Sequence, residues 1–141
     1  MTKNYLEFYK KYECKKYTVF ENKNWIVSLR PEQKTPFSFL ICLKSNVYEL
    51  RKLTSKQLLD LRECYNYIEN VSYDKLGAKK VNYACLMMVD SIVHYHVFPR
   101  FESDLNILGK TLKDVYYPKP VDILDGHSID IELIKKCLES L

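Results

Sequence analysis

Val89-Asp90-Ser91-Ile92-Val93-His94-Tyr95-His96-Val97-Phe98-Pro99-Arg100 is rich in β-branched and aromatic residues, which predicts a strand. Side chains alternate between the two faces of a strand, which places four of them on one face: Asp90, Ile92, His94 and His96. The two imidazoles would stand about 7 Å apart, from a rise of roughly 3.3 Å per residue. Pro99 lacks a backbone donor, so it marks the strand's end or an exposed edge.

A pair of histidines on one strand face can serve several purposes. Both rings can be structural and pack in the core. The pair can also supply two ligands of a catalytic zinc site, whose third ligand would be Asp90, His127 or a cysteine. The spacing of the residues selects no third ligand, so both interpretations stay open at this point.

The segment 94–100 resembles the second half of the histidine-triad (HIT) motif, in which three histidines alternate with apolar residues before a Pro-Arg pair. Aligned on that pair, His94 takes the place of the middle histidine and His96 that of the third. Ile92 stands where the first histidine would be. The chain is therefore similar to a divergent, bacterial-type member of the HIT superfamily and resembles its diadenosine polyphosphate hydrolases.

The resemblance implies a function and a set of site residues. HIT enzymes cleave or transfer nucleotides at the α-phosphorus, so His94 would be the nucleophile that forms a nucleotidyl-histidine, and His96 would donate to the phosphate or the leaving group. Substrate binding would fall to Ser28, in place of a ribose-binding acid or amide, to Asp90 and to Arg100. The implied ligand is a nucleotide or a dinucleoside polyphosphate, with no cofactor and no bound metal.

Departures from the HIT pattern favour a second interpretation, a nucleotide-binding HIT-like protein with weakened catalysis. Phe37-Ser38 stands where the family has Gly-His, and Met87-Met88 stands where many members have Gly-Gln. Neutral imidazole is a competent nucleophile near pH 7 because its unperturbed pKa is close to 6.5. One positioned donor is typically worth about 10²–10³ in rate. Replacing the first histidine by Ile92 therefore lowers efficiency before it removes the reaction.

The composition fits one compact domain in a reducing compartment. The 141 residues are 47% hydrophobic and carry a net charge of +4, which suits an anionic small molecule and is too mild to predict nucleic acid. Three glycines argue against a Gly-rich phosphate loop. The five cysteines form no C-x-x-C pair, and no signal peptide or apolar run of about 18 residues is present. We expect a cytoplasmic protein with no membrane partner.

Hydrophobic patterning predicts an α+β fold, with about five antiparallel strands, one long helix across the sheet and helices at both ends. Apolar periodicity indicates helices over Tyr5–Glu13, from Thr54 onward, and after Ser128. Besides the strand with His94, strands are expected over Tyr17–Glu21, Trp25–Arg30, Phe37–Leu43 and Val81–Val89. Residues 1–141 then form a single HIT-like domain, with a core over about 17–101 and a C-terminal extension, 102–141, that starts as an extended loop.

The long helix has the clearest local signals. Thr54 and Gln57 form a capping-box pattern at its start. Its apolar stripe is expected to contain Leu58, Leu61, Tyr65 and Ile68.

The resemblance also implies a homodimer, since HIT proteins are usually two-fold dimers. Three residues lie off the expected stripe of the long helix: Leu59, Cys64 and Tyr67. The run Val81–Val89 would leave a bare apolar edge that invites aggregation. A second copy would cover both features, and the alternative is that the N-terminal helix or the residues after Arg100 cover them within one chain.

Overall fold

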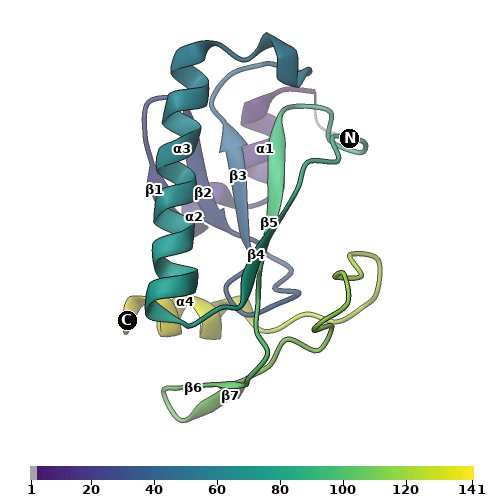
Figure 1. Cartoon of the computed structure of the whole chain (residues 1–141). Helices are drawn as coiled ribbons and strands as arrows, with labels where there is room; N and C mark the ends of the chain where they lie inside the picture. Colours follow the sequence, from purple (N-terminus) through teal and green to yellow (C-terminus); the bar gives the residue numbers. More distant parts are fainter. Residues whose placement is uncertain (1–2) are drawn as a thin grey trace.

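The computed structural model describes residues 3–141. Its main sheet contains five antiparallel strands in the order β1-β2-β3-β5-β4 (Figure 1). The strands are β1 (Thr18–Glu21), β2 (Trp25–Leu29), β3 (Phe39–Leu43), β4 (Lys80–Ala84) and β5 (His94–Arg100). The expected α+β fold, a five-stranded antiparallel sheet crossed by one long helix, is confirmed.

Helices cover both faces of this sheet (Figure 1). The N-terminal helices are α1 (Tyr5–Lys11) and α2 (Cys14–Tyr17). The connection between β3 and β4 contains the 3-10 turn η1 (Leu50–Lys52), the long helix α3 (Ser55–Glu69) and the π-helical turn η2 (Asn70–Lys75). The chain ends in α4 (Ile131–Glu139).

Strand β5 begins at His94 and not at Val89, so the first half of the predicted strand is wrong. The backbone of Val93 still bonds to β3, since its carbonyl accepts from Leu43 at 3.4 Å, while its N–H donates to Val47 at 2.9 Å. Before β5, residues 85–93 form an irregular connection, within which Asp90 is held by the ammonium group of Lys11 at 2.8 Å. His94 and His96 do share a face, whereas Asp90 and Ile92 lie outside the strand.

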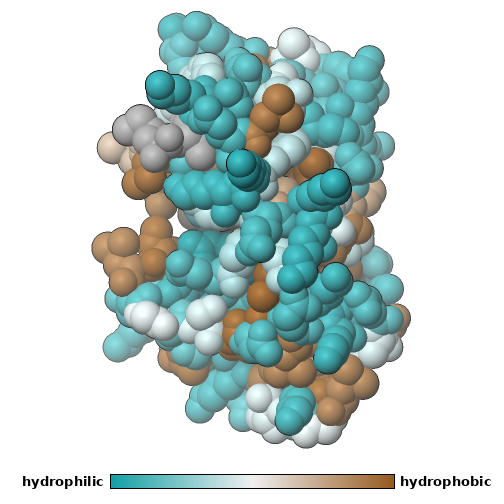
Figure 2. Space-filling view, turned by 180° about the vertical axis from the view of Figure 1, so that it is seen from behind, coloured by the Kyte–Doolittle hydropathy of each residue, from teal (hydrophilic) through white to brown (hydrophobic). Residues whose placement is uncertain are grey.

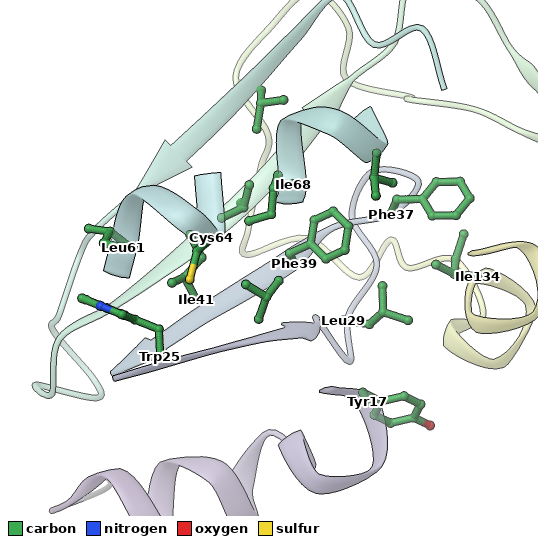
Figure 3. Packing of buried hydrophobic residues seen from close by; sticks show 14 of the residues in the cluster. Tyr17, Trp25, Leu29, Phe37, Phe39, Ile41, Leu61, Cys64, Ile68 and Ile134 are labelled. Carbon is green, nitrogen blue, oxygen red and sulfur yellow. The ribbon is translucent and has the colours of Figure 1, made fainter. Parts of the chain in front are cut away.

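Helix α3 begins as the sequence predicts, because Thr54 and Gln57 form both hydrogen bonds of the capping box. Its buried side is shifted from the expected stripe: Leu61, Cys64 and Ile68 pack on the sheet, while Leu58 is exposed. These side chains meet Trp25, Phe39 and Ile41 in the main core (Figure 3). Cys64 therefore belongs to the core and offers nothing to a dimer interface.

A second, smaller core fills the opposite face of the sheet. Phe8 of α1 is buried there against Ile92 and against three residues of α2 and β3: Cys14, Leu40 and Cys42. Because His94 and His96 lie on this face of β5, α1 packs on the same side of the sheet as the two imidazoles.

The C-terminal extension is not one long loop. It contains a short hairpin of β6 (Leu105–Ile107) and β7 (Lys110–Leu112). The two residues between these strands, Leu108 and Gly109, both have positive φ, at 52° and 71°. Two central residues with positive φ give a turn whose twist matches that of a hairpin.

The rest of the extension packs back onto the domain. The guanidinium of Arg100 donates to Asp114 at 2.7 Å, and the buried ammonium of Lys34 donates to the carbonyl of Asp125 at 2.6 Å. Helix α4 follows its N-cap Asp130, two residues after Ser128, and buries Ile134 and Cys137 in the main core.

The face of the molecule opposite to the view of Figure 1 is mostly hydrophilic. Figure 2 shows one face, on which hydrophobic side chains form small separate patches among polar ones. Among residues 3–141, none of the helices has both the length and the apolar character needed to span a bilayer.

Candidate active site

His94 is the first residue of β5, and its ring is fixed by the backbone. Its Nδ1 lies 2.7 Å from the carbonyl oxygen of Ile92. A carbonyl oxygen only accepts, so Nδ1 carries the hydrogen and Nε2 keeps a lone pair. Burial lowers the pKa of His94. The hydrogen bond to Ile92 raises this pKa, but by less than burial lowers it. The ring is therefore neutral at pH 7 and presents Nε2 as a nucleophile.

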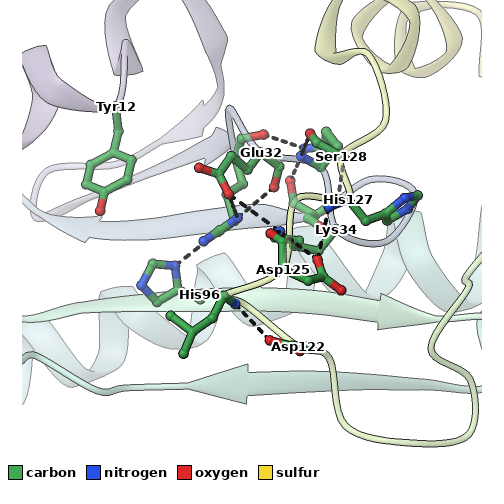
Figure 4. Close-up of polar contacts among 12 residues, drawn as sticks. Tyr12, Glu32, Lys34, His96, Asp122, Asp125, His127 and Ser128 are labelled. Atoms are coloured by element: carbon green, nitrogen blue, oxygen red, sulfur yellow. Dashed lines mark hydrogen bonds and ion pairs between the residues drawn. The ribbon is translucent and has the colours of Figure 1, made fainter.

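His96, two residues along the same strand, has the opposite arrangement. The Nε of Arg30 donates to Nδ1 of His96 over 3.2 Å, and the dashed line from His96 in Figure 4 marks this bond. Since Nδ1 accepts, Nε2 carries the hydrogen. Burial, then the charge of Arg30 and then His94, lower the pKa of His96 to about 3. His96 is thus a neutral hydrogen-bond donor at pH 7.

The two rings lie close enough to act on one phosphate group. Their centroids are 5.1 Å apart and their planes are nearly perpendicular. They are 3% and 8% exposed, so a ligand would reach them in a largely dry setting where hydrogen bonds are electrostatically stronger than in water. One ring offers a lone pair and the other an N–H, which are the two groups that a displacement at phosphorus needs.

Arg30 is a site residue that the sequence patterns missed. It directly follows β2 and is buried, with Nη1 donating to the carbonyl of Glu32 at 2.7 Å. Its guanidinium lies 5.7 Å from the ring centroid of Phe98. The sequence offered one signal, a cation at the end of the predicted strand Trp25–Arg30, but its pairing with His96 bridges 66 residues.

Helix α1 and the segment after it close one side of the site. The ring of Phe8 lies 4.6 Å from that of His94, measured between centroids. Asp90 is buried and accepts from Lys11 at 2.8 Å and from the hydroxyl of Tyr12 at 2.9 Å. The carboxylate of Asp90 thus ties the connection 85–93 to the N-terminal segment.

A pocket of about 170 Å³ opens at the two histidines. Its lining comes from four parts of the chain: Tyr12, Arg30, the segment 86–90 with His94 and His96, and Ile123. Within the segment, Met87 has φ of 51°, in the left-handed region that costs a non-glycine residue about 1–2 kcal/mol. The pocket therefore combines a cation, a carboxylate and two imidazoles under an apolar rim.

The structure does not bring every expected site residue to this pocket. Asp90 lines it, but Ser28 and Arg100 do not. The hydroxyl of Ser28 is fully buried and donates to the carbonyl of Leu29. Arg100 is also buried, and its guanidinium binds Asp114, the Asn82 amide oxygen and the Lys119 carbonyl. These contacts hold Arg100 outside the pocket, and its expected attraction of phosphate stays a prediction.

His127 lies in the C-terminal extension, where its ring packs against that of Tyr116 at 5.8 Å between centroids. Within residues 3–141, no three His, Cys, Asp or Glu side chains gather as a metal site requires.

Comparison with solved structures finds the same architecture in histidine-triad proteins. A histidine triad protein of Sinorhizobium meliloti 1021 matches with a TM-score of 0.64 and 18% identity, covering 89% of each chain. A histidine triad protein from Bradyrhizobium japonicum matches with a TM-score of 0.65 and 14% identity, covering 91% of this chain and 90% of that protein. A hypothetical histidine triad nucleotide-binding protein from Sulfolobus tokodaii matches with a TM-score of 0.58 and 15% identity. The match covers 88% of this chain and 81% of that protein.

The chain has the histidine-triad fold. Comparison with protein-family models and with curated proteins gives no match. The likeness thus rests on shape. The His-x-His segment of this chain lies at the start of β5.

Proposed function

We propose that the chain is a HIT-superfamily nucleotide hydrolase or nucleotidyl transferase that acts at the α-phosphorus through a nucleotidyl intermediate on His94. The observation that carries this proposal is the pair of opposite tautomers. His94 presents a lone pair on Nε2 because Ile92 holds its Nδ1 hydrogen, and His96 presents an N–H because Arg30 occupies its Nδ1.

The proposed reaction uses each group once. The Nε2 lone pair of His94 forms a bond to phosphorus, and the leaving group departs with the electron pair of the bond that breaks. The resulting cationic ring keeps its Nδ1 hydrogen on the carbonyl of Ile92. His96 donates its Nε2 hydrogen bond to the developing negative charge. The side chain of Ile92 takes no part in these steps, which supports catalysis without the first histidine of the motif.

The second candidate is a nucleotide-binding protein that has lost catalysis. Phe8 favours it, because its ring packs directly on His94 and leaves that imidazole almost wholly buried. In that case a nucleotide would bind beside Arg30 without reacting. The roles given to Asp90, Ser28 and Arg100 in substrate binding stay predictions, and Asp90 is the one of the three that lines the pocket.

Trapping the intermediate tests the proposal. The protein is mixed with an adenosine 5′-phosphoramidate or a dinucleoside polyphosphate, quenched, and analysed by mass spectrometry of its peptides. We expect an adenylyl group on His94 and no turnover by His94→Ala, while His96→Ala loses about 10²–10³ in rate. His127→Ala, which changes a histidine of the extension, should behave like the parent protein. Binding of nucleotide without any adduct or turnover would favour the second candidate.

We also propose a homodimer in a cytoplasmic setting. Strand β4 lies at the edge of the sheet, and Leu58 and Leu59 are exposed on α3. A two-fold interface that joins these elements would cover both. All five cysteines are free thiols, as expected in a reducing compartment. Sedimentation at micromolar concentration should give twice the 16.8 kDa chain mass, and a monomer mass would contradict the dimer.

A further inference from the structure

A second pocket, of about 360 Å³, continues from the site on the far side of His96. Three residues line both pockets: Leu86, His96 and Ile123. The second pocket adds Phe98 from β5 and Val121 from the C-terminal extension, whereas His94 lines only the first. The order along the site is therefore His94, His96 and then the second pocket.

The lining of the second pocket carries no formal charge. Among the residues that the structure describes, no Lys, Arg, Asp or Glu side chain lines it. Its polar side chains are the neutral His96 and the amide of Asn82, whose oxygen is already taken by Arg100. A polyphosphate bound there would lose the water around several negative charges, and no cation of the lining would pair with them. Burying unpaired charges costs free energy, so this binding is unfavourable. An apolar, planar group would gain by burial.

The geometry of in-line displacement indicates which part of a substrate would lie in the second pocket. The departing atom stands opposite the attacking Nε2 of His94, and the hydrogen on Nε2 of His96 is the donor next along the site. A neutral His96 can donate a hydrogen bond, but it does not protonate the leaving group, because losing the Nε2 hydrogen would leave an imidazolate anion. The geometry therefore suits a leaving oxygen that departs as a stable anion.

Resting on the proposed function, we infer that the second pocket receives a planar aromatic leaving group, so that the substrate is an aryl ester of a nucleoside 5′-monophosphate. The Nε2 lone pair of His94 forms the N–P bond while the P–O bond to the aryl group breaks. The electron pair leaves on the aryl oxygen, which accepts from His96 and takes its proton from solvent. Water then attacks phosphorus, the N–P bond returns its pair to His94, and the water's proton passes to solvent.

Two substrates that differ only in the leaving group test this inference. Adenosine 5′-(4-nitrophenyl phosphate) releases an aromatic anion, and adenosine 5′-phosphorofluoridate releases fluoride. We expect Val121→Asp to reduce kcat/KM for the aryl ester about 10- to 100-fold more than for the fluoridate. Leu124→Asp also places a carboxylate in the extension, but at a residue that is 91% exposed. It should leave kcat/KM unchanged for both substrates. Equal losses on both substrates would mean that the pocket holds the nucleobase, and would overturn the inference.

A binding measurement separates this inference from the proposed function. Phenol titrated into methyl-labelled protein should shift the methyl signals of Val121 and Ile123 but not those of Leu124. If phenol binds there and neither ester is cleaved, the proposed reaction fails and the aromatic pocket stands. If the fluoridate is cleaved but phenol shifts neither methyl signal, or diadenosine tetraphosphate is preferred to the aryl ester, the inference fails alone.

Discussion

At the scale of single residues, the site depends on which ring nitrogen of each histidine is occupied. Arg30 controls His96 in two ways, since it donates to Nδ1 and adds a positive charge that disfavours protonation. Removing that charge removes one of the causes that lower the pKa of His96. We therefore expect Arg30→Gln to raise the pKa of His96 above its value of about 3, as measured by an NMR titration of the imidazole protons. Arg51→Gln, at an exposed position, should leave the titration unchanged.

The sequence predicted half of this arrangement. Alternation along a strand was enough to place His94 and His96 on one face, because that relation is local. Arg30 could not be found in the same way, because β2 and β5 do not pair and are brought together only by the folded sheet. Arg100 also could not be placed from the sequence, because the Asp114 carboxylate that accepts from its guanidinium lies 14 residues ahead, in the extension.

At the scale of elements, α1 matters most to the site because it packs against His94 through one side chain. Phe8 is 1% exposed and lies in the smaller core with Ile92. We expect Phe8→Ala to lower the free energy of unfolding by about 3–5 kcal/mol, as in other buried phenylalanines. Urea unfolding measures this, and Leu6→Ala, on the exposed side of the same helix, should change it by about 0.5 kcal/mol or less. If both variants lost the same free energy of unfolding, the burial of Phe8 would not be what joins α1 to the sheet.

Elements with strong local signals were predictable and those fixed by contacts were not. The capping box of Thr54 predicted the start of α3 correctly, because both of its hydrogen bonds lie within four residues. The start of β5 was misplaced, and the contacts of the segment before it are not local: Asp90 accepts from Lys11, 79 residues away in the sequence. The hairpin of β6 and β7 went unpredicted because Leu108 occupies a positive-φ position that Asn or Gly normally marks.

At the scale of the whole molecule, the extension is joined to the sheet by a buried ion pair. Asp114 accepts from Arg100 and from the backbone N–H groups of Phe101, Tyr116 and Tyr117. Asp114→Ala would leave Arg100 charged and buried, which costs about 3–5 kcal/mol. Chemical denaturation should show that loss, while Asp104→Ala, at an exposed position of the same extension, should cost about 0.5 kcal/mol or less. Equal stability of both variants would show that the extension is held by other contacts.

The carbonyl of Ile92 has a consequence for which side chains position 92 can carry. Every amino acid at position 92 supplies the same carbonyl oxygen, so no substitution there deletes the group that orients His94. The side chain at this position can therefore serve packing, as Ile92 does beside Phe8, without changing the direction of the reactive nitrogen. A search that requires all three histidines would overlook a site oriented by a backbone carbonyl in this way.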